Sequence, residues 1–126
     1  MRVRATLISL MAGALILGCG GDNPTDPPEP GELRVTVASG TPVGAVVLTV
    51  TGPSITSPAA AAGNLLYHDL SDGTLHAVVT GAAISGEIMR FAVPDVGQVA
   101  GYQVSVQEAA GTSNQPLAGV TLSVVQ

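Results

Sequence analysis

The sequence contains no lysine, no tryptophan and a single cysteine, Cys19. One cysteine cannot form an intrachain disulfide and cannot build a zinc site by itself. The four basic residues are all arginines, and they stand against nine acidic residues. Because binding to nucleic-acid phosphates needs clustered cations, this balance argues against a nucleic-acid partner.

Aromatic side chains are scarce, since the chain has only Tyr67, Phe91 and Tyr102. The core must therefore be built from aliphatic residues. Sugar-binding faces commonly stack sugar rings on exposed tryptophan or tyrosine. A carbohydrate-binding module that uses Tyr67 or Tyr102 is therefore an alternative, and the lack of tryptophan counts against it.

Residues 1–18 have the pattern of a secretory signal peptide. Arg2 and Arg4 form a basic start, residues 5–17 carry no charge, and a small residue precedes Cys19. This order of basic, apolar and small residues is typical of a secretory signal. The apolar run is shorter than the roughly 20 residues that a helix needs to cross a bilayer.

The segment Ile16-Leu17-Gly18-Cys19 resembles the lipobox of bacterial lipoproteins. The resemblance implies that the Cys19 thiol receives a diacylglyceryl group, that the chain is cut before it, and that an acyl chain such as palmitate is then added. Two or more acyl chains suffice for stable anchoring, whereas one gives only marginal attachment. The glycine after Cys19 implies, by the same analogy, an outer-membrane location in the cell envelope, at its periplasmic face or the cell surface. The alternative is a cleaved secretory signal with an incidental cysteine.

Residues 19–31 are rich in proline and glycine and are expected to form an extended tether between the lipid anchor and a folded domain. Without residues 1–18, two arginines remain against nine acidic residues, a formal charge of −7. Electrostatic attachment to anionic lipid is therefore not expected, and the acyl anchor is the predicted contact with the membrane. The remaining chain, residues 32–126, has the length of one domain.

Apolar and polar residues alternate with period two through most of residues 32–126, as expected for strands with one buried face. The alternation is clearest in residues 33–37, 46–50, 102–106 and 120–124. Turn residues separate the runs, which predicts an all-β fold: a single antiparallel β-sandwich of about seven to nine strands. Only residues 57–63 are expected to make a helical turn, ending at Gly63.

Asp72-Gly73 between two alternating runs predicts a hairpin with a two-residue type I′ turn. This turn would pair Ser71 with Thr74, Leu70 with Leu75, Asp69 with His76 and His68 with Ala77. The two histidines would then lie on opposite faces of the sheet. We expect His68 to be a partly buried, hydrogen-bonded residue, and His76 to form a cross-strand polar pair with Asp69.

No set of residues predicts catalysis. Metal ligands and catalytic groups must converge, whereas His68 and His76 are predicted to diverge, and no serine lies in a G-x-S-x-G motif. No catalytic residue, resident metal or cofactor is therefore expected. A small hydrolase that depends on either histidine is the weakest functional alternative.

The carboxylates are candidates for two kinds of site, a calcium site and a catalytic pair. Asp69, Asp72 and Asp95 are predicted near strand ends, where loop oxygens can surround calcium, although two of them are already explained as turn residues. Nothing in the sequence brings two carboxylates together for glycoside hydrolysis. Glu87 and Arg90, three residues apart on a predicted strand, are expected to point to opposite faces.

Three segments resemble, in order, strands of cohesin-like β-sandwich domains: residues 44–53, 73–81 and 84–94. Immunoglobulin-like sandwiches share this general architecture. Gly52-Pro53 replaces the Asp-Pro that usually follows the second cohesin strand, and the domain is shorter. The resemblance therefore implies a non-catalytic sandwich that presents a surface, and dockerin binding is not carried over.

Together these features predict a non-catalytic, lipid-anchored envelope protein whose β-sandwich acts as a binding or structural module. Its exposed strand faces are rich in threonine, serine, glutamine and valine, and its edge strands lack lysine. Such surfaces suit a protein partner, which is the predicted ligand class.

Overall fold

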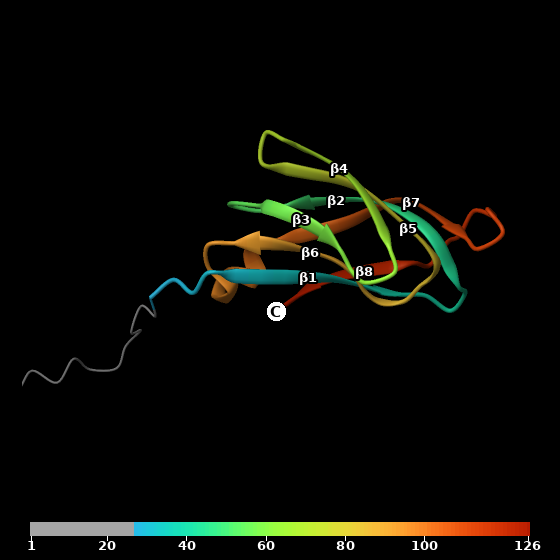
Figure 1. Cartoon of the computed structure of the whole chain (residues 1–126), viewed down its shortest axis with the longest axis horizontal. Coiled ribbons are helices and arrows are strands. Elements are labelled where there is room, and N and C mark those ends of the chain that lie inside the picture. Colours follow the sequence, from blue (N-terminus) through green and yellow to red (C-terminus); the bar gives the residue numbers. More distant parts are fainter. Residues whose placement is uncertain (1–26) are drawn as a thin grey trace, which may run out of the picture.

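The structure is a computed structural model that describes residues 27–126 (Figure 1). It contains eight strands and one short 3₁₀ helix. The strands are β1 (Gly31–Ala38), β2 (Val43–Thr51), β3 (Thr56–Ala60), β4 (Leu65–Ser71), β5 (Thr74–Ile84), β6 (Gly86–Val93), β7 (Gln103–Gly111) and β8 (Thr121–Val125). The helix, η1 (Val96–Gly101), lies between β6 and β7.

The strands form two four-stranded antiparallel sheets, in the orders β3-β6-β1-β8 and β4-β5-β2-β7. The predicted antiparallel β-sandwich is therefore confirmed. Six of the seven connections between successive strands cross from one sheet to the other, and the β4–β5 hairpin is the one that stays within its sheet (Figure 1). Edge strands β3 and β4 lie along one side of the sandwich, and β7 and β8 lie along the other.

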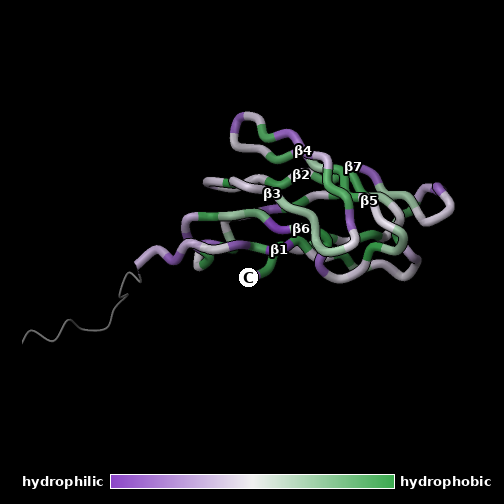
Figure 2. Tube along the Cα trace, viewed as in Figure 1, coloured by the Kyte–Doolittle hydropathy of each residue, from purple (hydrophilic) through white to green (hydrophobic). Residues whose placement is uncertain are grey.

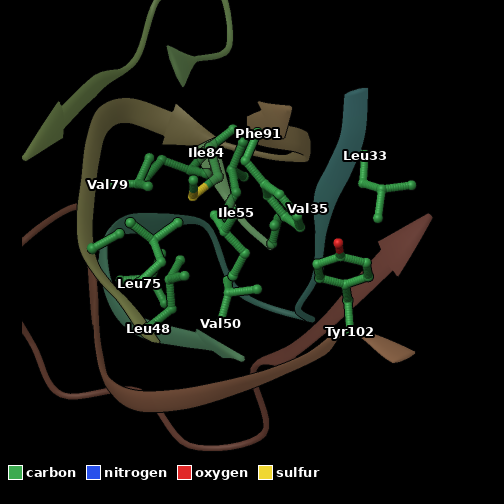
Figure 3. Close-up of a cluster of buried hydrophobic side chains, with 14 of the residues drawn as sticks. Leu33, Val35, Leu48, Val50, Ile55, Leu75, Val79, Ile84, Phe91 and Tyr102 are labelled. Carbon is green, nitrogen blue, oxygen red and sulfur yellow. The ribbon is translucent and has the colours of Figure 1, made fainter. Parts of the chain in front are cut away.

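The core lies between the sheets and comes from the predicted alternation. In β2, Val46, Leu48 and Val50 are fully buried, while the residues between them face outward. Leu33 and Val35 of β1 meet them from the opposite sheet (Figure 3). In Figure 2, hydrophobic stretches recur along the strands of both sheets. Burial of each such aliphatic side chain contributes about 1.5–3 kcal/mol, which makes this layer the main source of stability.

Tyr102 closes one part of the core. Its ring lies with its centroid 5.6 Å from that of Phe91, in a tilted arrangement. Its hydroxyl donates a hydrogen bond to the Ser54 carbonyl oxygen at 2.7 Å, so the polar end of a buried side chain is satisfied. Gly52 allows this position, because a Cβ there would overlap the Tyr102 ring.

The expectation that Glu87 and Arg90 point to opposite faces is wrong. Val35 pairs with Met89 and Thr36 pairs with Glu87, so Ile88 is an extra residue in β6, a β-bulge. The extra residue reverses the alternation and brings both charged residues to the outer face. Arg90 Nε lies 3.5 Å from Glu87 Oε1, as an ion pair. That oxygen is buried and accepts no hydrogen bond from the described residues, so the contact is electrostatic only.

The expected helical turn at residues 57–63 is also wrong. Residues 56–60 form β3, which pairs with β6 at the edge of its sheet. The register shifts between Thr56 and Ala59, where Ser57 adopts a φ of 48°, and Pro58 is tolerated in such an irregular edge strand. Pairing with β6 thus overrides the helical preference of the alanines. The helical turn occurs instead at η1, where the Asp95 side chain accepts a hydrogen bond from Gly97 N at 2.9 Å.

The described chain begins at the end of the sandwich that carries η1. Val96 N donates to the Glu29 carbonyl oxygen at 2.9 Å, and Gly31 pairs with Val93. The fold therefore takes in the last residues of the expected tether. The β4–β5 turn lies at this same end, and the loops around residues 39–42 and 81–86 lie at the far end (Figure 1).

Candidate functional site

The predicted lipid attachment site, Cys19, lies outside the described residues, as do residues 1–18 and most of the predicted tether. Among residues 27–126, no helix is long and apolar enough to span a bilayer. Lipidation of Cys19 remains a prediction of the sequence.

The predicted hairpin is confirmed residue by residue. Asp69 pairs with His76 and His68 pairs with Ala77, in a register without shifts. Asp72 and Gly73 have φ values of 52° and 74°, as a type I′ turn requires. The two histidines therefore belong to opposite faces of the sheet, and the described structure does not bring them together.

The environment of His68 differs from the expectation. His68 points to the same side as the buried Ala77, yet its side chain is exposed. Leu70 on the same side is 42% exposed, because β4 is an edge strand and the opposing edge strand β3 is short. The expectation of a partly buried His68 is therefore wrong. An edge strand can extend beyond the sheet that would cover it, and sequence alternation does not show this.

The candidate calcium ligands are not gathered. Asp69 lies on the outer face of β4, Asp72 lies in the hairpin turn, and Asp95 caps η1 after β6. Within residues 27–126, no group of three histidine, cysteine, aspartate or glutamate side chains is placed to hold a metal ion. Asp72 and Asp95 thus act as the turn and cap residues that their sequence context indicates.

The most distinctive surface of the described chain is the outer face of the β4-β5-β2-β7 sheet, which we call the B face. Register places Tyr67, Val78, Val47 and Glu108 in one row across the four strands. The neighbouring row contains Asp69, His76, Thr49 and Ser105. Leu65 begins a third row. Apolar side chains therefore run across the middle of the face, with carboxylates at its sides.

Two shallow hollows meet on the B face at Val47. One, of about 290 Å³, is lined by Val47 with Tyr67, Asp69, His76 and Val78, among others. The second, of about 230 Å³, lies on the other side of Val47 and is lined by Ala45, Glu108, Ala110 and Pro116, among others. Both hollows are open and mainly apolar, which suits side chains from another molecule better than an enclosed small-molecule site.

Two large apolar side chains stand out on the B face. Leu65 is 61% exposed and Tyr67 is 63% exposed. Most other large apolar side chains of residues 27–126 are buried or half-buried, so the exposure of these two sets the B face apart. The alternation in the sequence gave no sign that the outer rows of four strands would join into an apolar strip.

Charge differs between the two outer faces. Residues 27–126 contain two arginines and no lysine. Arg34 of β1 and Arg90 of β6 lie opposite each other in the register of the other sheet. Glu32 and Glu87 lie on the same outer face, so its charges balance. The B face carries Asp69 and Glu108 with no arginine. It is therefore the acidic face as well as the apolar one.

A larger hollow of about 520 Å³ lies at the far end of the sandwich, between the β1–β2 and β5–β6 connections. Its lining consists of small and aliphatic residues and includes no titratable side chain. It offers neither an anchoring aromatic nor a charged group for specific recognition.

Comparison with known proteins gives no relative. No protein-family model matches the chain, and neither the curated proteins nor the solved structures contain a match. The resemblances to lipoproteins and to cohesin-like domains therefore remain predictions from the sequence.

Proposed function

We propose that this protein is a non-catalytic binding module, anchored in the bacterial cell envelope through lipid on Cys19, and that its B face binds another protein. The observation that carries the proposal is the apolar strip on which Leu65 and Tyr67 are largely exposed and two hollows meet at Val47. Surfaces of this kind, with an apolar middle and polar margins, are typical of protein contacts.

The charges on the B face indicate the kind of partner. Asp69 and Glu108 lie on either side of the apolar strip, at opposite edges of the four-stranded sheet. A complementary partner would place aliphatic or aromatic side chains against Val47 and Val78, with lysine or arginine toward the two carboxylates. Association should therefore weaken as ionic strength rises, because exposed charge pairs are screened.

Binding can be tested with a matched pair of variants. Val47→Asp places a charge in the middle of the B face, and Thr36→Asp places one on the outer face of the other sheet. Both positions are half-buried and lie on inner strands of their sheets. We expect Val47→Asp to abolish capture of a defined envelope protein by the anchored chain, and Thr36→Asp to preserve it. Equal capture by both variants would contradict binding through the B face.

The anchor has a separate test. Cells that produce the chain are grown with labelled palmitate, and the label on the purified protein is measured with and without Cys19→Ala. We expect the label to be incorporated into the unaltered chain and lost in the variant. Unlabelled protein that is cleaved and released would support the secretory alternative instead.

Carbohydrate binding is the second candidate, supported by the exposure of Tyr67. Tyr102 cannot contribute to it, because its side chain is buried and its hydroxyl is bonded to Ser54. A glycan array tests this candidate. Carbohydrate binding would be supported by glycan capture that is lost in Tyr67→Ala.

A further inference from the structure

Strand β4 is an open edge of unusual regularity. Its seven residues pair with β5 without a register shift, and it contains neither proline nor lysine. Soluble proteins usually protect such edges with bulges, proline, lysine or short strands, because unpaired backbone groups recruit other strands. On its free side, β4 has none of these devices.

The other three edge strands of the described chain are protected. β3 is five residues long, contains Pro58 and has a break in register. β8 is also five residues long. β7 has two register shifts against β2, and its last part is covered by the following loop, where Leu117 N donates to the Ala109 carbonyl oxygen at 2.9 Å. Among the four edge strands of the described chain, β4 is thus the one that lacks these protective features.

Exposed apolar side chains coincide with this edge. The large hydrophobic side chains that residues 27–126 leave exposed are Leu65, Tyr67 and Leu70, and all three belong to β4. Leu65 and Tyr67 lie on the B face, whereas Leu70 lies on the inner side. A partner strand placed alongside β4 would cover apolar groups on both sides of the sheet.

The hairpin turn determines which backbone groups are free. A two-residue turn makes Ser71 and Thr74 a hydrogen-bonded pair, and such pairs alternate with non-bonded ones along an antiparallel ladder. Ser71, Asp69, Tyr67 and Leu65 therefore direct their backbone groups to β5. Leu66, His68 and Leu70 direct theirs to the open side.

We propose that β4 pairs antiparallel with β4 of a second copy of this chain, about a two-fold axis at His68. This register uses all three free residues. Leu66 then lies opposite Leu70 of the second copy, and His68 lies opposite His68. On the B face, Tyr67 lies opposite Asp69 of the second copy. A register centred on Tyr67 would leave Leu70 beyond the other strand's free residues.

The sequence of β4 fits this register on both sides of the sheet. Leu66 and Leu70 are both apolar and would cover each other's exposed surface. Tyr67 of one copy and Asp69 of the other form a cross-strand pair of phenol donor and carboxylate acceptor. They occupy a non-hydrogen-bonded position, where side chains are closest. The strand is thus complementary to itself, which favours a second copy over an unrelated strand.

The inference goes beyond the proposed function and does not depend on it. The two-fold axis is normal to the sheet, so both B faces lie on the same side of an eight-stranded sheet. The dimer uses Tyr67 and leaves Val78, Val47 and Glu108 of the same row free for another protein. The dimer can be tested without any other protein. If the chain proves monomeric, the proposed binding through the B face is unaffected.

Cysteine substitutions in the full chain test the register. Opposite residues of a hydrogen-bonded pair have Cα atoms about 5.5 Å apart, within the span of a disulfide. Under mild oxidation, His68→Cys should yield a covalent dimer joined at position 68, identified by mass spectrometry of the linked peptide. Leu66→Cys alone should yield no more dimer than the unsubstituted chain, because its two copies lie about 13 Å apart. A mixture of Leu66→Cys and Leu70→Cys chains should link.

The unsubstituted chain controls for Cys19, and Gln103→Cys on β7 controls for pairing at the other edge of the same sheet. Sedimentation of the unsubstituted chain in detergent should show a dimer that Leu70→Lys converts to monomer. A monomer at all concentrations would overturn the inference. Equal linkage at positions 66, 68 and 70 would also overturn it, as would linkage through position 103 alone.

Discussion

Gly52 and Tyr102 show how one residue without a side chain determines where a large one lies. A Cβ at position 52 would overlap the Tyr102 ring, so the glycine is needed for space. We expect Gly52→Ala to lower the free energy of unfolding by about 1–3 kcal/mol through overpacking. Denaturant unfolding measures the change. Gly40→Ala is the control, because a Cβ at position 40 meets nothing within 4 Å, and an equal loss in both variants would contradict the explanation.

The Tyr102 hydroxyl provides a second test at this scale. Tyr102→Phe keeps the ring against Phe91 but removes the donor to the Ser54 carbonyl oxygen. We expect a loss of about 1 kcal/mol in the free energy of unfolding, measured in the same way. Tyr67→Phe changes an exposed hydroxyl and should leave stability unchanged. Equal stability of Tyr102→Phe and the unaltered chain would contradict the assigned hydrogen bond.

Residue environments were predictable where the signal was local. Asp72 and Gly73 adopt the positive φ values that their turn requires, and that requirement is readable in two letters. The exposure of His68 was not predictable, because it depends on how far the opposing sheet extends over β4. Alternation shows which side a residue faces, and it does not show what lies on that side.

Among the strands, the hairpin follows from a local sequence signal, whereas the bulge depends on contacts that are distant in sequence. The β4–β5 register follows from the turn between the strands. The extra residue at Ile88 depends on pairing with β1, which is distant in sequence, and its carbonyl oxygen accepts hydrogen bonds from Ala61 N and the Asn64 side chain. No local pattern marks that arrangement. It places Glu87 and Arg90 on the same face and explains the wrong expectation for that pair.

The β4–β5 turn should control the stability of its hairpin. Gly73→Ala should destabilise the hairpin by about 1 kcal/mol, because a Cβ is unfavourable at a φ of 74°. Since β4 pairs with β5 at the edge of its sheet, hydrogen exchange should accelerate in residues 65–71 before it does so in β2. Exchange measured by mass spectrometry checks this. Asp72→Asn, which also tolerates positive φ, should leave exchange unchanged, and uniform acceleration across all strands would contradict the prediction.

At the scale of the whole molecule, the fold separates two kinds of surface. The outer face of β3-β6-β1-β8 carries Arg34 and Arg90 with two glutamates. The B face carries an apolar strip with Asp69 and Glu108 at its sides. The sequence predicted the sandwich, since alternation recurs in strand after strand. The B face depends on the lateral order of strands, which alternation does not encode.

Binding through the B face is best tested by site-specific photocrosslinking in the envelope of living cells. A photoreactive amino acid replaces Val47 in the middle of the B face, or Thr36 on the opposite outer face as the control. We expect a defined adduct with another protein from position 47, weakened by Glu108→Lys and absent from position 36. The same adducts from both positions, or no protein adduct from position 47, would contradict a binding function of the B face.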